Sequence, residues 1–193
     1  VTSSPQLAFN TSGQKIISVT SSIPGCESGA AIDTIFINDL PETTFTANLA
    51  CEGTETIFSN ESAEASYAWL FDDGYQSKAA DPTHLYEQPG TYQVTLMTED
   101  ANGCRDTVTQ EVRVGAIPEP NFAYDLICAE EMVQIRDQSS VASSDIVGWE
   151  WIFADSVIST EQSPMLAFEN SGVYELEQRI YSAAGCEQSI SKS

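Results

Sequence analysis

Residues 67–94 read YAWLFDDGYQSKAADPTHLYEQPGTYQV, and this stretch carries the local signals that decide the fold. Tyr67, Trp69 and Phe71 are separated by single residues, so all three point to one face of an extended strand. The pair Asp73-Gly74 follows directly and is a turn signal, because glycine adopts positive φ without steric penalty. The stretch therefore predicts a half-buried antiparallel strand that ends in a tight turn.

A second pattern in this stretch, a proline followed by an aromatic residue and then a glycine, occurs three times in the chain. Its copies are Pro5, Phe9 and Gly13; Pro82, Tyr86 and Gly90; and Pro164, Phe168 and Gly172. A Gly-Cys pair follows each copy and ends at Cys26, Cys104 and Cys186. Pro41, Phe45 and Cys51 likewise match Pro118, Phe122 and Cys128, with a shift of 77 residues (118 − 41). Self-similarity at a period of this length indicates tandem structural repeats.

The register of these matches divides the chain into three units. Residues 1–39 correspond to the C-terminal half of one repeat, which we call unit 1. Residues 40–116 form a complete repeat, unit 2, and residues 117–193 form unit 3, which lacks only the last few residues of its final strand. The register leads us to expect that the natural protein continues in both directions.

Each unit shows short strand patterns with turns between them, and no segment keeps an apolar 3.6-residue period. The expected fold class is all-β, with tandem immunoglobulin-like β-sandwiches of about seven strands per repeat. Trp69 and Trp151 fall on the central strand of their units, where an indole can fill the space between two sheets. Tyr92 shares the apolar face of its strand with Val94, and Tyr174 is its counterpart in unit 3.

Composition and charge exclude several classes of function. The chain has 29 acidic and 7 basic residues and a formal net charge of −22, which disfavours nucleic acid and anionic membrane surfaces. It contains no apolar run of about 18 residues, so we expect no membrane insertion in this segment. His84 is the only histidine, and no nucleophile motif or zinc-ligand spacing is present. The sequence therefore predicts a protein that is not an enzyme.

Unit 2 also carries an ordered set of motif residues: Trp69, Phe71, Asp73-Gly74, Ser77, Pro82, His84, Tyr86, Gly90-Thr91-Tyr92, Val94 and Gly103-Cys104. This set strongly resembles the hallmark of the PKD (polycystic kidney disease) domain family, from which unit 2 departs at Leu70 and Asp72. Unit 3 is more degenerate, with Leu166 and Phe168 at the positions of His84 and Tyr86. We expect structural roles for six residues: Trp69, Asp73, Gly74, Tyr92, Trp151 and Tyr174.

The cysteines are widely spaced, which suggests disulfides and an oxidising, extracellular or cell-surface location. Each complete unit has one cysteine before its second strand and one before its last strand. We therefore predict the disulfides Cys51–Cys104 and Cys128–Cys186. Cys26 aligns with the second cysteine of each pair, so its partner is expected upstream of Val1. The alternative is an exposed Cys26 that forms intermolecular disulfides.

No cofactor is expected, although loop oxygens leave calcium as an option. Asp72, Asp73, Asp100 and Asn60 lie near predicted strand ends, and hard oxygen ligands on converging loops suit Ca²⁺. Against a calcium site, Asp73 is explained by its turn and Asp72 falls where the PKD family usually has glycine. We assign no calcium ligands on this basis.

Three functions remain open. The arrangement resembles PKD arrays of very large surface proteins of Bacteroidetes-type bacteria, which implies a structural or adhesive segment, a stalk or display array, for gliding or attachment. Its partners would be neighbouring repeats of the same chain, surface glycans or other proteins. The alternative is an accessory substrate-binding module of a secreted polysaccharide- or protein-degrading enzyme. A third hypothesis is a half-repeat completed by a strand from another chain.

Overall fold

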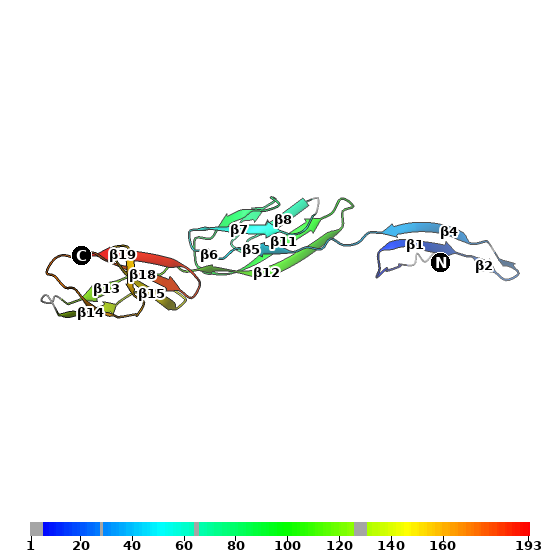
Figure 1. Ribbon diagram of the computed structural model, residues 1–193. Helices are drawn as coiled ribbons and strands as arrows, with labels where there is room; N and C mark the ends of the chain where they lie inside the picture. Colours follow the sequence, from blue (N-terminus) through cyan, green and yellow to red (C-terminus); the bar gives the residue numbers. More distant parts are fainter. Residues whose placement is uncertain (1–5, 28, 64–65, 126–130) are drawn as a thin grey trace.

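The computed structural model describes residues 6–27, 29–63, 66–125 and 131–193, which contain β-strands and no helix (Figure 1). The all-β fold class is therefore confirmed.

Unit 1 contains β1 (Gly13–Val19), β2 (Ser22–Ile23), β3 (Cys26–Glu27) and β4 (Ala31–Ile37). Unit 2 contains β5 (Phe45–Ala47), β6 (Ala50–Cys51), β7 (Glu55–Asn60), β8 (Ser66–Leu70), β9 (Gln76–Ser77), β10 (Thr83–Leu85), β11 (Gly90–Glu99) and β12 (Arg105–Gly115). Unit 3 contains β13 (Phe122–Tyr124), β14 (Met132–Asp137), β15 (Ile146–Phe153), β16 (Ser156–Ser159), β17 (Met165–Ala167), β18 (Leu176–Ser182) and β19 (Glu187–Lys192). Within the described ranges, no helix is long and apolar enough to cross a membrane.

Unit 2 is a sandwich of two sheets, one with strand order β10-β7-β5 and the other with order β6-β12-β11-β8-β9. The long strands β11 and β12 form the centre of the larger sheet, and β8 pairs with β11 so that Trp69 lies opposite Leu96. Trp69 and Phe71 are buried, whereas Leu70 between them faces outward. The period of two seen in the sequence therefore sets which side chains enter the core.

Trp69 lies at the centre of the unit 2 core, and its side chain is fully buried. Phe45 of the opposite sheet meets the indole edge-on, with ring centroids 5.0 Å apart, and Phe58 approaches it at 5.5 Å. The indole Nε1 donates a hydrogen bond to the carbonyl oxygen of Ala79 at 3.0 Å. The buried polar atom of Trp69 is therefore satisfied, and the ring serves as apolar filling between the sheets.

Unit 3 repeats this arrangement with sheets of order β13-β14-β17 and β16-β15-β18-β19. Trp151 is fully buried, and its Nε1 donates to the carbonyl oxygen of Glu161 at 2.8 Å. Phe122 meets the indole edge-on at 5.1 Å, as Phe45 does in unit 2. Two sandwiches in one chain are thus built around the same tryptophan contact.

The described part of unit 1 is a pair of long strands, β1 and β4, with a short β2–β3 ladder between them. Lys15 lies opposite Ile35 in this pair, as Tyr92 lies opposite Val112 between β11 and β12. Val19 is 64% exposed, although its counterpart in unit 2, Leu96, is fully buried. The strand pair of unit 1 therefore has the same register as β11 and β12, and within the described residues Val19 is not covered as Leu96 is.

The predicted disulfides Cys51–Cys104 and Cys128–Cys186 are wrong, because Cys51 is bonded to Cys186. The Cα atoms of this pair are 5.9 Å apart, and the bond joins unit 2 to unit 3. Within unit 2, Cys51 pairs with Gly115 at the last residue of β12, whereas Cys104 directly precedes the first residue of the same strand. Ten residue steps along a strand span roughly 33 Å. A disulfide needs Cα atoms within about 7 Å, so Cys51 cannot reach Cys104.

The remaining cysteines are only partly described. Cys104 is not disulfide-bonded and is partly buried. Cys128 and the side chain of Cys26 lie outside the described residues. The expectation that Cys26 pairs with an upstream cysteine therefore stays a prediction.

Candidate functional site

Asp73 and His84 meet at one edge of unit 2, where the turn after β8 lies beside β10. The Asp73 carboxylate accepts the Tyr75 amide at 3.1 Å, and its second oxygen lies 2.6 Å from the His84 Nε2. The imidazole stacks on Phe71, with centroids 4.3 Å apart. Gly74 has φ of +93°, a conformation that side chains disfavour. The contacts among these residues hold the turn after β8 against β10.

Two tyrosines complete this edge of the core. Tyr86 stacks on Tyr92 at 3.9 Å and donates its hydroxyl to the carbonyl oxygen of Phe71. Burial, and then the nearby Asp73 carboxylate, raise the pKa of Tyr86 well above its usual value, so its hydroxyl stays a donor at physiological pH. The Tyr92 hydroxyl donates to the Gln88 carbonyl oxygen at 2.8 Å, which pins β11 to the preceding turn.

The corresponding edge of unit 3 is apolar. Phe153, Phe168 and Tyr174 form a ring cluster with centroid separations of 4.4 to 6.1 Å. Tyr174 donates to the carbonyl oxygen of Asn170 at 2.7 Å, as Tyr92 does to that of Gln88. The cluster therefore packs this edge as the aromatic residues of unit 2 do, but unit 3 has Leu166 in place of His84 and so has no equivalent of the Asp73–His84 pair.

Asp137 is the centre of a polar network in unit 3 that the sequence did not indicate. Its carboxylate accepts hydrogen bonds from the Trp149 Nε1 at 2.9 Å and from the Gln178 Nε2 at 2.8 Å, and also from Gln162 and Ser139. Burial alone would raise the pKa of Asp137, but these donors outweigh burial and lower it. The sequence feature that could have indicated this network is Gln178, a polar residue at the position that the apolar Leu96 occupies in unit 2. In the structure Gln178 is fully buried.

The loop oxygens considered for calcium are engaged by protein donors. Asp72 accepts the Gln93 amide at 2.9 Å, and Asp100 accepts the amides of Asn102 and Cys104, both at 2.8 Å. Asn60 bonds the backbone of Ser62. In the part of the chain that the structure describes, no three His, Cys, Asp or Glu side chains gather in a way that could hold a metal ion.

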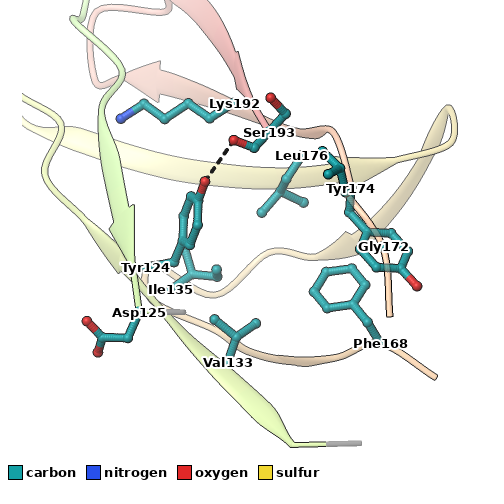
Figure 2. Close-up of a pocket in the computed structure, with 11 residues that line it drawn as sticks. Tyr124, Asp125, Val133, Ile135, Phe168, Gly172, Tyr174, Leu176, Lys192 and Ser193 are labelled. Carbon is teal, nitrogen blue, oxygen red and sulfur yellow. Dashed lines mark hydrogen bonds between the residues drawn. The ribbon is translucent and has the colours of Figure 1, made fainter. Parts of the chain in front are cut away.

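A hollow of about 330 Å³ opens beside β14 and β18 of unit 3 (Figure 2). Val133, Ile135, Phe168 and Leu176 give it apolar walls, and the Tyr124 hydroxyl donates to the Ser193 carbonyl oxygen across its rim at 2.9 Å. In unit 2 the corresponding space is filled by the last residues of β12, where Val112 and Val114 are buried. The lining of the hollow is thus mainly apolar, and it also includes Tyr124, Asp125, Lys192 and Ser193.

The joint between units 2 and 3 is formed by a disulfide and by close contacts at two glycines. Beside the Cys51–Cys186 bond, the Glu52 amide donates to the Gly115 carbonyl oxygen at 2.8 Å. A Cβ on Gly115 would lie 2.6 Å from the Cys186 Sγ and 2.7 Å from the Ala184 Cβ. The glycine is required here because the next unit packs directly on its backbone.

The other side of the joint is equally close. Gly185 has φ of +82°, and a Cβ there would meet the Leu49 side chain at 2.7 Å. The Ile117 amide donates to the Glu52 carboxylate at 2.9 Å, which ties the linker to unit 2. This joint was not predictable from the cysteine spacing, because that spacing is equally consistent with disulfides that close within one unit. The joint is thus a structural contact that holds unit 3 against unit 2.

The fold and the joint define a class of protein, the immunoglobulin-like β-sandwich module. Comparison with known families gives a more specific result, because residues 38–114 match the PKD domain family. Unit 2 is therefore a PKD domain, and unit 3 is a further β-sandwich that follows it.

Two curated relatives match part of the chain. Collagenase ColA from Bacillus cereus is 38% identical over 60 residues, which is 31% of this chain and 6% of the collagenase. Collagenase ColQ1 from Bacillus cereus is 38% identical over 56 residues, 28% of this chain and 6% of the relative. The chain thus spans only a small fraction of the length of the relatives it matches.

Among solved structures, the PKD1 domain of the Vibrio cholerae metalloprotease PrtV is 33% identical, with a TM-score of 0.36. That match covers 39% of this chain and 98% of the domain. The PKD1 domain of Vibrio anguillarum Epp is 29% identical, with a TM-score of 0.37, over 40% of this chain and 95% of the domain.

Proposed function

We propose that the chain is a non-catalytic accessory segment of a larger extracellular protein, in which it holds neighbouring parts at a fixed spacing. The observation that carries this proposal is the Cys51–Cys186 disulfide across the joint. A covalent bond between two sandwiches adds nothing to catalysis, but it restricts the angle between them. Disulfides persist in oxidising compartments, which supports an extracellular location.

The spacing role predicts that units 2 and 3 tumble together. We expect NMR relaxation of the backbone amides to give one rotational correlation time for both units in the oxidised chain. The variant Cys51→Ser should give shorter and separate correlation times for the two units. Cys104→Ser is the matched control, because this cysteine is not bonded, and it should behave as the unaltered chain does. Separate tumbling in the oxidised, unaltered chain would contradict the proposal.

We place the segment beside the catalytic part of a secreted protein-degrading enzyme, because its PKD domain is similar to parts of two collagenases. The repetition of the unit supports a second placement, an adhesive display array on a cell surface. The sequence that flanks the segment in its natural protein separates the two. A neighbouring catalytic domain favours the accessory role, and further copies of the unit favour the array.

Contact with a protein substrate is a second candidate function within the accessory role. Tyr75 is 68% exposed and its ring lies 5.4 Å from that of His84, so unit 2 presents an aromatic ring to solvent on one edge. Co-sedimentation with insoluble collagen tests this contact. We expect Tyr75→Ala to lower the sedimented fraction and Tyr124→Ala, on unit 3, to leave it unchanged. Failure of the unaltered chain to sediment with collagen would contradict this candidate.

A further inference from the structure

Each sandwich has two poles, and the cysteines of unit 2 lie at opposite ones. At the pole where the chain enters, the Thr43 amide donates to the Asp106 carboxylate at 3.1 Å, and the Thr43 hydroxyl lies 2.6 Å from that of Thr98. Cys104 precedes β12 at this same pole, which we call the N-terminal pole. At the C-terminal pole, β6 pairs with the end of β12 and places Cys51 beside Gly115.

In unit 3, Cys186 sits at the corresponding N-terminal pole, immediately before β19. The Ser182 amide donates to the Cys186 carbonyl oxygen at 2.8 Å, and the Gly185 amide donates to the Ser182 carbonyl oxygen at 2.9 Å. The observed disulfide therefore runs from the C-terminal pole of one unit to the N-terminal pole of the next.

The turn that presents Cys186 is reproduced at Cys104. The Asp100 amide donates to the Cys104 carbonyl oxygen at 3.0 Å, and the Gly103 amide donates to the Asp100 carbonyl oxygen at 3.2 Å. Gly103 and Gly185 have φ of +83° and +82°. Cys104 thus has the sequence position and the backbone setting of a cysteine that is bonded to the preceding sandwich.

We propose that Cys104 forms a second inter-unit disulfide, with a cysteine placed like Cys51 in a sandwich that precedes unit 2. The two thiols lose two protons and two electrons as the S–S bond forms, and a disulfide oxidant takes up both and is reduced to two thiols. The proposal extends the staple seen at Cys51–Cys186 to successive joints of an array. It holds whichever larger protein carries the segment.

A chain with a duplicated unit tests the proposal directly. A second copy of residues 40–116 is inserted after Ala116, so that one complete unit 2 precedes another in the natural register. The first copy carries Cys104→Ser, and glutathione disulfide is the oxidant. Non-reducing peptide mapping should find the Cys51 peptide linked both to the Cys186 peptide and to the Cys104 peptide. The link to Cys186 shows that the joint with unit 3 is folded, so its presence without the link to Cys104 would overturn the proposal.

Two further variants remove ambiguity about which copy is linked. In the duplicated chain, Cys51→Ser in the second copy and Cys186→Ser leave a pairing between copies as the only source of a Cys51–Cys104 link, and this link should persist. The control is the chain of ordinary length with Cys186→Ser, which holds Cys51 and Cys104 in one sandwich. Both should remain alkylatable thiols there. A Cys51–Cys104 link in this control would overturn the proposal.

The natural joint before unit 2 has Asn38 at the position of the glycine that is Gly115 in the next joint. At Gly115 a Cβ would lie 2.6 Å from the Cys186 Sγ, so we expect the Asn38 side chain to require a shift at its own joint. The duplicated chain with Gly115→Asn in its first copy tests this difference. We expect the link to Cys104 to form and to be reduced at a lower dithiothreitol concentration. Its absence in this variant alone would overturn the proposal for the joint that Asn38 forms.

Discussion

At the scale of single residues, the two sandwiches hold the polar atoms of their central tryptophans and of Asp137 by giving these atoms hydrogen-bond partners. Trp69 and Trp151 each donate the indole N–H to a backbone carbonyl ten residues further along the chain. Asp137 is partly buried, and it collects several donors around its carboxylate. Because unsatisfied buried polar atoms are expensive, these partners let the rings and the carboxylate occupy the interior.

Trp69→Ala should lower the free energy of unfolding of unit 2 by about 3–5 kcal/mol, because it removes the central ring and leaves a cavity. Urea unfolding followed by circular dichroism measures the change. The control is Tyr75→Ala, whose ring is exposed, and it should alter the free energy by no more than about 0.5 kcal/mol. Equal effects of the two substitutions would show that Trp69 does not fill the core.

Asp137 should make unit 3 sensitive to acid. Its pKa is lower in the folded state than in the unfolded chain, so its stabilisation is present above the usual aspartate pKa of about 3.9 and is lost as the pH falls through the folded value. We expect Asp137→Asn to reduce the free energy of unfolding at neutral pH by about 1–2 kcal/mol. The difference from the unaltered chain should shrink in acid.

The matched control for this carboxylate is Asp125→Asn. Asp125 forms an exposed ion pair with Arg136, so its removal should change stability by less than about 1 kcal/mol. Urea unfolding at a series of pH values compares both variants with the unaltered chain. An effect of Asp137→Asn that does not vary with pH would show that the ionised carboxylate is not the stabilising form.

At the scale of elements, the last strand of unit 2, β12, covers part of the core of its sandwich. β12 continues to Gly115 and covers the core with Val112 and Val114. β19 pairs with β18 from Glu187 to Lys192, and in the register of unit 2 the equivalents of Val112 and Val114 would follow Ser193. The apolar hollow of unit 3 lies at this place (Figure 2).

Copying the four residues Val112–Gly115 after Ser193 should fill the hollow. Burial of two valines is expected to raise the free energy of unfolding of unit 3 by about 2–4 kcal/mol. Urea unfolding of the chain with Trp69→Phe, followed by the fluorescence of Trp149 and Trp151, measures the gain. The same extension with serine in place of both valines is the control and should add little. Equal stability of the two extended chains would contradict the correspondence between β12 and β19.

The sequence allowed these elements to be predicted because their signals are local. The period of two in residues 67–71 and the glycine turns act over a few residues, so they predicted the all-β class. The Asp137 network was not predictable, because it depends on which side chains meet across strands far apart in the sequence. The disulfide prediction was wrong for a related reason. The length of β12 places Cys104 at one end of unit 2 and Cys51 at the other.

At the scale of the whole molecule, the joint is a covalent and closely packed contact between two sandwiches. The Cys51–Cys186 bond spans 135 residues of sequence, so it restricts the unfolded chain as well as the angle between the units. Gly115 and Gly185 let the two backbones approach without side chains between them.

Gly115→Ala should weaken this joint, because its Cβ would lie 2.6 Å from the Cys186 Sγ. We expect the disulfide to form and to be reduced at a dithiothreitol concentration about tenfold lower, which corresponds to about 1.4 kcal/mol of overpacking strain. Gly90→Ala is the control, since a Cβ there meets only the Tyr92 ring at 3.6 Å, an ordinary contact. An unchanged reduction midpoint for Gly115→Ala would contradict the close packing.

The central claim is that sulfur joins neighbouring sandwiches and does not close either one. Non-reducing peptide mapping of the oxidised chain, after alkylation of free thiols, measures this directly. The predicted result is a peptide pair that links Cys51 to Cys186, together with an alkylated Cys104. A link between Cys51 and Cys104 would contradict the claim and return the disulfide to the interior of unit 2.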